Sequence, residues 1–364
     1  MEILPKTLGT RPRLAVEVRA EAVVAARAED AAALLTAVAR ADLAEGAVTP
    51  GLKAGNIADK TAVTAAVRKV LDGIAGSGRE RLRDVTVVVP DSAARVLFVD
   101  FDQLPAKAVE ALPVVRFRLK KLLPFDADDA MVSYQVMSSE KNSIKLLAVA
   151  MPKAVLEEYE SVVLAAGYLP GAVLPSTLAA LAGLEETDAA ALVVNAGQGT
   201  LTTAIVQAGM LLLHRSVDMS ASAPAEITTV VPVVDRESTA QEWAQQEALG
   251  PGGWDRFDAE AAMQTSVVET AVLREVGLKV AARDVAQAVS VAAAYFEDSL
   301  QRSPEQLLAA GTVGAETVSA MMEENGVEGL RVREMVDAGM MQPGAVTSSV
   351  PRGWLAGVRG ALRN

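Results

Sequence analysis

The sequence predicts an α/β protein of about two domains, with a small α/β unit inserted into the first. A single domain usually has roughly 100–200 residues, so a chain of 364 residues is expected to form about two domains. A chain of this length can bury a substantial core. Two β-branched runs predict buried strands, one at residues 85–89 and one at residues 192–206, where a turn interrupts the run. Between them, strand and helix patterns alternate quickly over residues 95–166, which is typical of a helix laid across a small sheet.

Apolar spacing and turn residues predict the elements of the first half of the chain. Residues 14–18 and 22–26 predict a hairpin, and apolar side chains at helical spacing predict helices at residues 29–40 and 60–75. Pro113 is expected to limit one later helix to the residues that follow it. The further strands are expected at residues 85–89, 95–101, 131–137 and 144–150, and the further helices at residues 106–123, 155–166 and 174–184.

The second half begins with a hairpin from Ala190 and ends with a short amphipathic helix at residues 354–362. After residues 218–270, for which no regular element is predicted, a long helix is expected at residues 281–300. A strand at residues 307–310 then runs into a glycine turn, and a helix follows whose N-terminus faces that turn.

Composition and charge exclude several classes of function. The chain has no cysteine and one histidine, His214, which leaves no thiolate chemistry and too few ligands for a zinc site. A net charge of −12 opposes nucleic-acid binding. Two thirds of that excess lies in residues 218–270, which carry ten carboxylates against two arginines and predict a surface insertion or linker. The N-terminus lacks a signal peptide and no apolar run spans a membrane, so a cytoplasmic protein is expected.

The turn from Asn195 to Thr200 is the first candidate functional site. Gly197, Gly199 and Thr200 can offer backbone N–H groups and a hydroxyl to a phosphate. Asn195, however, carries no negative charge to hold a magnesium-bound water or to act as a base. The alternative is an ordinary hairpin turn, since glycine and asparagine dominate such turns. A Rossmann turn is disfavoured because β-rich residues follow where a helix is needed.

Two other segments each allow two interpretations. Gly311 and Gly314 predict either a vestigial nucleoside contact or a plain strand-to-helix turn. The helix at residues 106–123 is basic, which suits a membrane surface, an acidic partner or simply a solvated helix face. Its cations are Lys107, Arg116, Arg118, Lys120 and Lys121.

Three blocks of the sequence together resemble the PilM family, the cytoplasmic actin-like proteins of type IV pilus assembly. The first block comprises Val87–Ser92, Leu104–Pro105, Arg116–Arg118, Leu123–Phe125 and Tyr134–Val136, in the order seen in that family's inserted subdomain. The second is the turn from Asn195 to Thr200, with Gly209 and Leu213–Arg215 after it. The third is Ala294–Leu300 leading into Ala310–Gly314, where the family places its nucleoside-contacting glycines.

The resemblance implies a two-domain actin-like, RNase H-like fold. Domain I would cover residues 1–188, with the inserted subdomain near residues 91–150, and domain II residues 189–340. The tail, residues 341–364, would return its helix to domain I. The resemblance also implies a cleft for ATP and Mg.

The nucleotide pattern of the family is altered at both phosphate hairpins of this chain. The family's first hairpin carries an aspartate and a glycine two residues apart, which fall here on Glu17 and Arg19. Glu17 keeps the charge on a longer arm, whereas Arg19 places a side chain where glycine lets the backbone approach a phosphate. With Asn195 in the second hairpin, the vestigial nucleotide site would comprise Glu17, Asn195, Gly197, Gly199, Thr200, Gly311 and Gly314.

The resemblance implies a scaffold that binds the short cytoplasmic N-terminal segment of PilN, an inner-membrane protein. Such a scaffold lies at the inner membrane through this partner and links it to the pilus assembly motor. A groove beside the inserted subdomain serves that role without hydrolysis. Two alternatives remain, an active actin-like ATPase or kinase that uses Glu17 and a cytoplasmic scaffold of the type II secretion GspL family.

Overall fold

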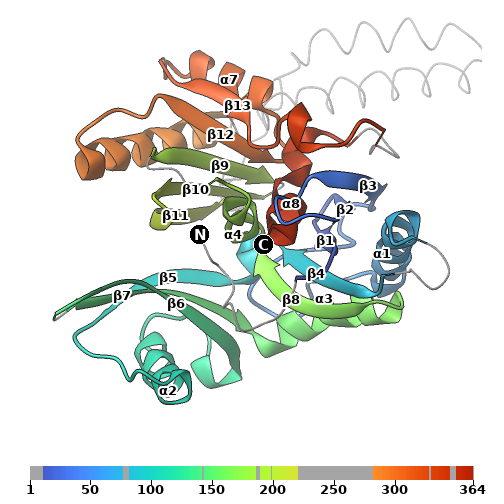
Figure 1. Cartoon of the computed structure of the whole chain (residues 1–364), viewed down its shortest axis with the longest axis horizontal. Helices are drawn as coiled ribbons and strands as arrows, with labels where there is room; N and C mark the ends of the chain where they lie inside the picture. Colours follow the sequence, from blue (N-terminus) through green and yellow to red (C-terminus); the bar gives the residue numbers. More distant parts are fainter. Residues whose placement is uncertain are drawn as a thin grey trace, which may run out of the picture.

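The computed structural model contains two five-stranded sheets and one three-stranded sheet (Figure 1). It describes residues 11–76, 82–141, 143–185, 189–197, 199–219, 282–327, 329–344 and 350–363. Within these residues no helix is both long and apolar enough to cross a membrane.

The first sheet has the strand order β3-β2-β1-β4-β8. β1 is antiparallel to β2 and parallel to β4, and β8 is parallel to β4. Helices α1 and α3 bury their apolar faces on one side of this sheet, where Val67, Tyr159 and Val87 share a core. The elements are β1 (Leu14–Val18), β2 (Ala22–Ala28), β3 (Leu35–Asp42), α1 (Lys60–Ile74), β4 (Asp84–Val89), α3 (Lys153–Ala165) and β8 (Leu169–Pro175).

The second sheet, β11-β10-β9-β12-β13, repeats the topology of the first. Its first three strands are antiparallel neighbours, and β12 is parallel to both β9 and β13. The helix over residues 282–300 and helix α7 share its outer core, in which Val289 and Val318 are buried. The elements are β9 (Ala191–Gly197), β10 (Thr200–Gln207), β11 (Met210–Asp218), β12 (Gln306–Gly311), α7 (Ala315–Glu324) and β13 (Arg331–Glu334).

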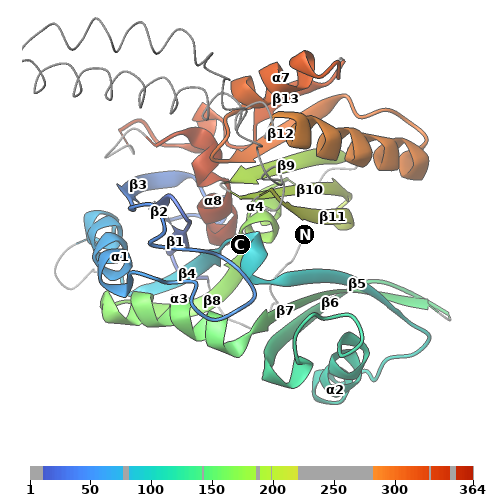
Figure 2. The same ribbon diagram turned by 180° about the vertical axis from the view of Figure 1, so that it is seen from behind.

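The small sheet, β5-β7-β6, is inserted into the first unit between β4 and α3. Helix α2 covers one of its faces, and Val99, Val115, Leu119 and Leu146 form a separate core there. Figures 1 and 2 show this unit extending away from the two larger sheets. The elements are the short helix η3 (Asp91–Ala93), β5 (Arg95–Phe101), α2 (Ala108–Leu119), the short helix η4 (Ala127–Asp129), β6 (Ala130–Glu140) and β7 (Ser143–Pro152).

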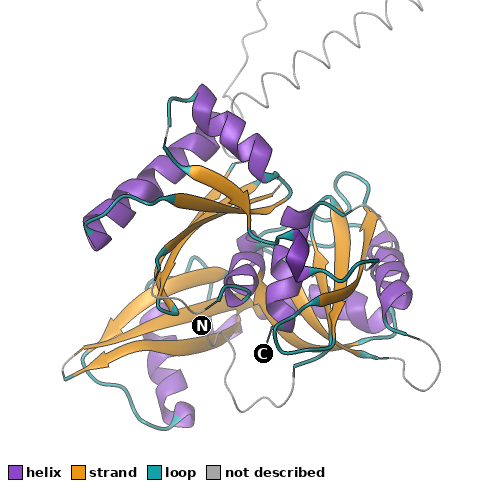
Figure 3. Ribbon diagram, turned by 45° about the horizontal axis from the view of Figure 1, so that its top comes forward, coloured by secondary structure: helices purple, strands orange, loops and turns teal. Residues whose placement is uncertain are grey.

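Two short helices cross between the larger sheets (Figure 3). They are α4 (Ser176–Ala182) and α8 (Ala356–Leu362), and the single turn η7 (Arg352–Leu355) leads into α8. Leu178, Leu181 and Val358 are fully or almost fully buried, in one core with Val88 of the first sheet and Val193 of the second. The C-terminal segment therefore fills the space between the sheets and holds them together.

Three predicted elements are wrong in detail. Residues 29–40 do not form a helix, because they turn and enter β3, where buried Leu35, Val38 and Ala41 lie three apart and imitate helical spacing. The helix predicted at residues 174–184 is β8 up to Pro175 and α4 only after it, since residues before a proline favour extended backbone. Helix α2 runs through Pro113 instead of starting after it.

Other predicted elements agree with the structure, and some predictions fall on residues outside it. The helix predicted at residues 60–75 is α1, and the side chain of Asp59 caps it by accepting from the N–H of Ala62. The strands β11 and β13 were not predicted. Most of the acidic stretch, from residue 220 on, and the boundary at residues 186–188 lie outside the described residues. The domain boundaries stay predictions.

Because α4 and α8 cross at close distance, we expect a substitution of Gly360 to destabilise the protein. A Cβ atom at Gly360 would lie 1.9 Å from the carbonyl oxygen of Ala179 and 2.8 Å from the amide nitrogen of Gly183. Because both neighbours are backbone atoms, Gly360→Ala would force the two helices apart and lower the free energy of unfolding by about 3 kcal/mol. Urea denaturation measures this change.

Gly73→Ala is the matched control, since Gly73 lies in α1 and a Cβ atom added there would have no neighbour within 4 Å. There the same substitution is expected to stabilise the protein by up to about 1 kcal/mol through helix propensity. Equal effects of the two substitutions would contradict the close crossing.

Candidate functional site

The predicted site lies where the ends of the two larger sheets face each other. Glu17 comes from β1 and Asn195 from β9, while Asp91 follows β4 directly after Pro90. Ser176 and Thr177 open helix α4 between them. All five side chains are buried, so the two halves of the molecule meet through polar groups removed from water.

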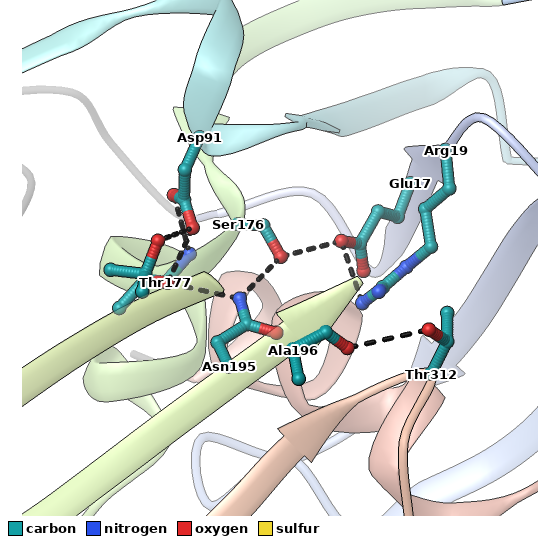
Figure 4. A network of polar contacts seen from close by, with 9 residues as sticks. Glu17, Arg19, Asp91, Ser176, Thr177, Asn195, Ala196 and Thr312 are labelled. Carbon is teal, nitrogen blue, oxygen red and sulfur yellow. Dashed lines mark hydrogen bonds and ion pairs between the residues drawn. The ribbon is translucent and has the colours of Figure 1, made fainter. Parts of the chain in front are cut away.

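These side chains form one hydrogen-bonded chain across the gap (Figure 4). The amide nitrogen of Asn195 donates to the hydroxyl of Ser176 at 3.0 Å and to that of Thr177 at 2.9 Å. Ser176 in turn donates to Oε1 of Glu17 at 2.6 Å, and Thr177 donates to Oδ2 of Asp91 at 2.5 Å. The amide of Asn195 thus donates a hydrogen bond to each of two hydroxyls, and each of these hydroxyls donates one to a carboxylate.

Further contacts hold Asp91 in this arrangement. Its Oδ1 accepts the backbone N–H of Thr177 at 2.9 Å, and its Oδ2 also accepts the hydroxyl of Thr202 on β10 at 2.9 Å. Asp91 therefore binds both the first residues of α4 and the second sheet. We call Glu17, Arg19, Asp91, Ser176, Thr177, Asn195 and Thr202 the cleft network.

The chemistry of Asn195 follows from its place in the cleft network. Its NH₂ group supplies the two donors that the hydroxyls of Ser176 and Thr177 require. An aspartate has no such donors, and it would add a third carboxylate beside Glu17 and Asp91. An asparagine is thus the residue that satisfies this arrangement, with or without a ligand.

Glu17 and Arg19 form a buried ion pair next to Asn195. Nη2 of Arg19 lies 2.8 Å from Oε1 of Glu17, and both side chains are at least nine-tenths buried. Burial raises the pKa of Glu17, and the nearby guanidinium of Arg19 lowers it by a smaller amount. Oε2 of Glu17 faces Gly357 of α8, where a Cβ atom would approach it to 2.6 Å.

Gly311 is required by close packing at the end of β12. Its φ is +94°, and a Cβ atom would lie 2.1 Å from the carbonyl oxygen of Ala196. That same oxygen accepts the N–H of Thr312 at 2.7 Å, which joins the ends of β9 and β12. The backbone of Gly311 also lies close to Gly353. A Cβ atom at position 353 would lie 2.8 Å from the carbonyl oxygen of Gly311, so only glycine fits there.

The structure brings five of the seven predicted site residues around one pocket of about 470 Å³. They are Glu17, Asn195, Gly197, Gly199 and Thr200. Gly311 is packed as described above, and Gly314 is the N-cap of α7 and lines a different pocket of about 700 Å³. There the carboxylate of Glu334 already accepts the N–H of Ala315 at 2.9 Å.

The residues around the 470 Å³ pocket do not fit Mg-ATP. Its charged lining consists of one cation, Arg19, and the four carboxylates of Glu17, Glu21, Glu45 and Asp91, which repel phosphate. Both oxygens of Asp91 and one of Glu17 already accept hydrogen bonds. Within the described residues no group of three acidic or histidine side chains could hold a metal ion. The site therefore matches neither a phosphate cradle nor a carboxylate magnesium site.

Sequence reasoning missed several members of the cleft network. Asp91, the neighbours Ser176 and Thr177, and Thr202 come from three separate segments, and only the folded topology brings them together. Two local signals existed, because Asp91 directly follows Pro90, which stops the strand before it, and Ser176 directly follows Pro175. A polar residue at the end of a buried parallel strand is typical of a site at the sheet edge.

A third pocket, of about 740 Å³, adjoins the 470 Å³ pocket beside the small sheet. Residues 49–55, the beginning of β5 and the paired strands β10 and β11 enclose it. Its lining is mixed, since Leu52, Val96 and Val217 are apolar and Lys53, Arg95 and Arg215 are cationic, with His214 among them. Burial lowers the pKa of His214 although Asp91 raises it, so the ring is neutral at pH 7.

The cleft network predicts a specific response to Asn195→Asp. The substitution removes two donors and buries a third negative charge, so the free energy of unfolding is expected to fall by about 3 kcal/mol at neutral pH. The loss is expected to shrink as the pH falls and the new carboxyl group becomes protonated. Urea denaturation across pH 4 to 8 (about the range in which carboxyl groups of raised pKa titrate) measures both effects. Gln103→Glu adds the same charge at an exposed position, and an equal loss there would contradict the prediction.

Comparisons with known proteins identify a shared fold. No protein-family model and no curated protein matches the chain. A chain of the PilM–PilN type IV pilus biogenesis complex aligns with a TM-score of 0.65 at 18% identity, covering 97% of this chain and 99% of that one. EutJ of Carboxydothermus hydrogenoformans aligns at 0.44 with 12% identity, covering 99% and 91%. The cytoplasmic domain of EpsL from Vibrio cholerae aligns at 0.37 with 15% identity, covering 57% and 71%.

Of these three likenesses, only the first is strong enough to establish a common fold. It extends over nearly the whole of both chains. The two-domain actin-like α/β fold with a small inserted α/β unit, predicted from the sequence, is confirmed. The resemblance to the PilM family that three sequence blocks predict is thereby confirmed at the level of the fold.

Proposed function

We propose that this chain is a non-catalytic cytoplasmic scaffold of a type IV pilus assembly machine. It binds the short cytoplasmic N-terminal segment of a PilN-like inner-membrane protein, is held at the membrane by that partner, and links it to the assembly motor. In this proposal domain I is residues 1–188, domain II is residues 189–340, and the tail is residues 341–364. The fold shared with a chain of the PilM–PilN complex supports it.

The observation that carries the non-catalytic role is the cleft network. Where an actin-like ATPase binds nucleotide between its domains, this chain joins the two sheets by its own side chains, from Glu17 through Ser176 and Asn195 to Thr177 and Asp91. Breaking these bonds to admit a ligand would leave buried donors and acceptors without partners, at about 1–3 kcal/mol each. A fixed relation between the sheets suits a scaffold that presents surfaces.

The 740 Å³ pocket is the proposed groove for the partner segment. It lies between the small sheet, the second sheet and the loop over residues 49–55, so a peptide there contacts all three. Leu52, Val96 and Val217 can bury apolar side chains, while the neutral ring of His214 can bond a peptide group. A short extended segment with apolar side chains fits this lining.

Titration with a synthetic peptide of the PilN-like N-terminus tests the proposal. Leu52→Glu removes an apolar contact with the peptide and is expected to weaken binding at least about tenfold, because burying a leucine side chain is worth more than about 1.4 kcal/mol. Calorimetry or fluorescence anisotropy measures the affinity. Leu169→Glu, on β8 and 53% exposed, is the matched control and is expected to bind as the unaltered chain does. No binding by the unaltered chain would refute the proposed partner.

A titration with Mg-ATP tests the enzyme alternative. Because the pocket beside Arg19 is lined by four carboxylates, we expect no saturable heat up to about 1 mM nucleotide, which corresponds to a binding free energy weaker than about −4 kcal/mol. Micromolar binding together with steady phosphate release that is lost in Glu17→Ala would instead support an ATPase or kinase.

A further inference from the structure

Helix α2 carries apolar side chains on both its inner and its outer face. Ala111, Val115 and Leu119 are buried against the small sheet. On the opposite face Val109 is 87% exposed and Phe117 is 70% exposed. A surface helix normally presents polar residues to water, so the outer face of α2 lacks the composition of a solvated face.

The outer face consists of two rows that each combine apolar and cationic residues. One row, with a four-residue spacing, contains Val109, Pro113 and Phe117 of α2 and Lys121 in the turn that follows the helix. The adjacent row contains Val114, Arg118 and Leu122, of which Val114 is 38% and Leu122 is 48% exposed. Apolar side chains and cations thus share one continuous surface, formed by α2 and the turn after it, which we call the α2 outer face.

The α2 outer face projects from the edge of the molecule. Figures 1 and 2 show α2 on the side of the small sheet that is remote from both larger sheets. None of the pockets described above contains a residue of α2. A projecting helix of this kind can lie on a flat surface, whereas it offers no groove for a peptide.

Charge sets this face apart from the rest of the chain. Residues 104–123 carry five cations and one carboxylate, Glu110, in a protein of net charge −12. Lys120 pairs with Asp128 at 2.5 Å, and Arg116 donates to the carbonyl oxygen of Ala130 at 2.8 Å. Within the described residues no ion pair involves Arg118 or Lys121. These two cations flank Phe117 and are available to an external anion.

We propose that the α2 outer face docks on an anionic lipid surface. Phe117, Val109 and Val114 would enter the boundary between headgroups and acyl chains, while the long side chains of Arg118 and Lys121 reach lipid phosphates. Helices that lie in a membrane interface have this combination of apolar and basic residues. The contact is direct, so it does not depend on the partner proposed above.

Single-helix docking is weak and acts together with a second attachment. Each cation near an anionic surface contributes about 1 kcal/mol. A protein already held near the membrane by one contact gains from a second through high effective concentration, without a strong contact at either place. The α2 outer face would then fix which side of the molecule faces the bilayer.

Flotation of the purified full chain with lipid vesicles tests this proposal without any protein partner. Binding is expected to vesicles of phosphatidylcholine containing about 30% phosphatidylglycerol, more than to phosphatidylcholine alone, and to weaken with added salt. The double variants Val109→Ser/Phe117→Ser and Arg118→Glu/Lys121→Glu are each expected to reduce binding at least about fivefold. Circular dichroism and thermal unfolding confirm that these exposed substitutions leave the fold intact.

Matched controls change the same chemistry elsewhere on the surface. Leu164→Ser on α3, at a side chain 52% exposed, and Lys69→Glu on α1 are expected to bind as the unaltered chain does. Equal retention on both kinds of vesicle, or unaltered binding by both double variants, would overturn the proposal. Retention on a polyglutamate column through Arg118 and Lys121, without vesicle binding, would overturn it too and would identify an acidic protein as the occupant.

Discussion

The close crossing of α4 and α8 is the constraint on which the rest of the molecule depends. Gly360 lets the two helices approach until only a glycine fits beside Ala179, and Gly357 lets α8 lie against Glu17. Because α4 leads out of the first sheet and α8 returns to it after the second, their contact fixes how the sheets face each other. The same approach buries the polar ends of β1, β4 and β9 and compels them to satisfy one another.

Burial of these groups has an electrostatic consequence for Glu17. Its pKa is raised from 4.5, so the native state holds the proton more tightly than the unfolded state does. The stabilising contribution of this group is fully present below pH 4.5, its unfolded-state value, and is lost as the pH rises through the raised native pKa. Arg19 offsets part of that loss by pairing with the ionised carboxylate. An arginine at this position therefore stabilises a closed cleft, where glycine would leave Glu17 without a charged partner.

Local sequence signals predict the helices and strands whose buried residues recur at one regular spacing along the chain. Asp59 and the helical spacing after it predicted α1, and the valine run before Pro90 predicted β4. β3 escaped prediction because both of its faces are buried, so Val38 and Ala41 belong to different cores and the alternation of a half-exposed strand is absent. Glu17 and Asn195, which the phosphate-hairpin resemblance singles out, line one pocket in the structure, and their role as a nucleotide site stays a prediction. The resemblance could not reveal their partners, since Asp91 and Thr177 are 86 positions apart and meet only through topology.

At the positions where the PilM-family resemblance places phosphate contacts, the side chains of Arg19 and Asn195 bind neighbouring side chains of the chain itself. Asn195 donates where an aspartate could only accept, and Arg19 supplies the charge that a buried Glu17 requires. Ser176 accepts from Asn195 and donates to Glu17, so β1 and β9 are linked through the first residue of α4. A cleft closed in this way cannot open and close cheaply. The pocket beside β5 and the α2 outer face lie outside this closed cleft, and they are the surfaces that the two proposals above assign to partners.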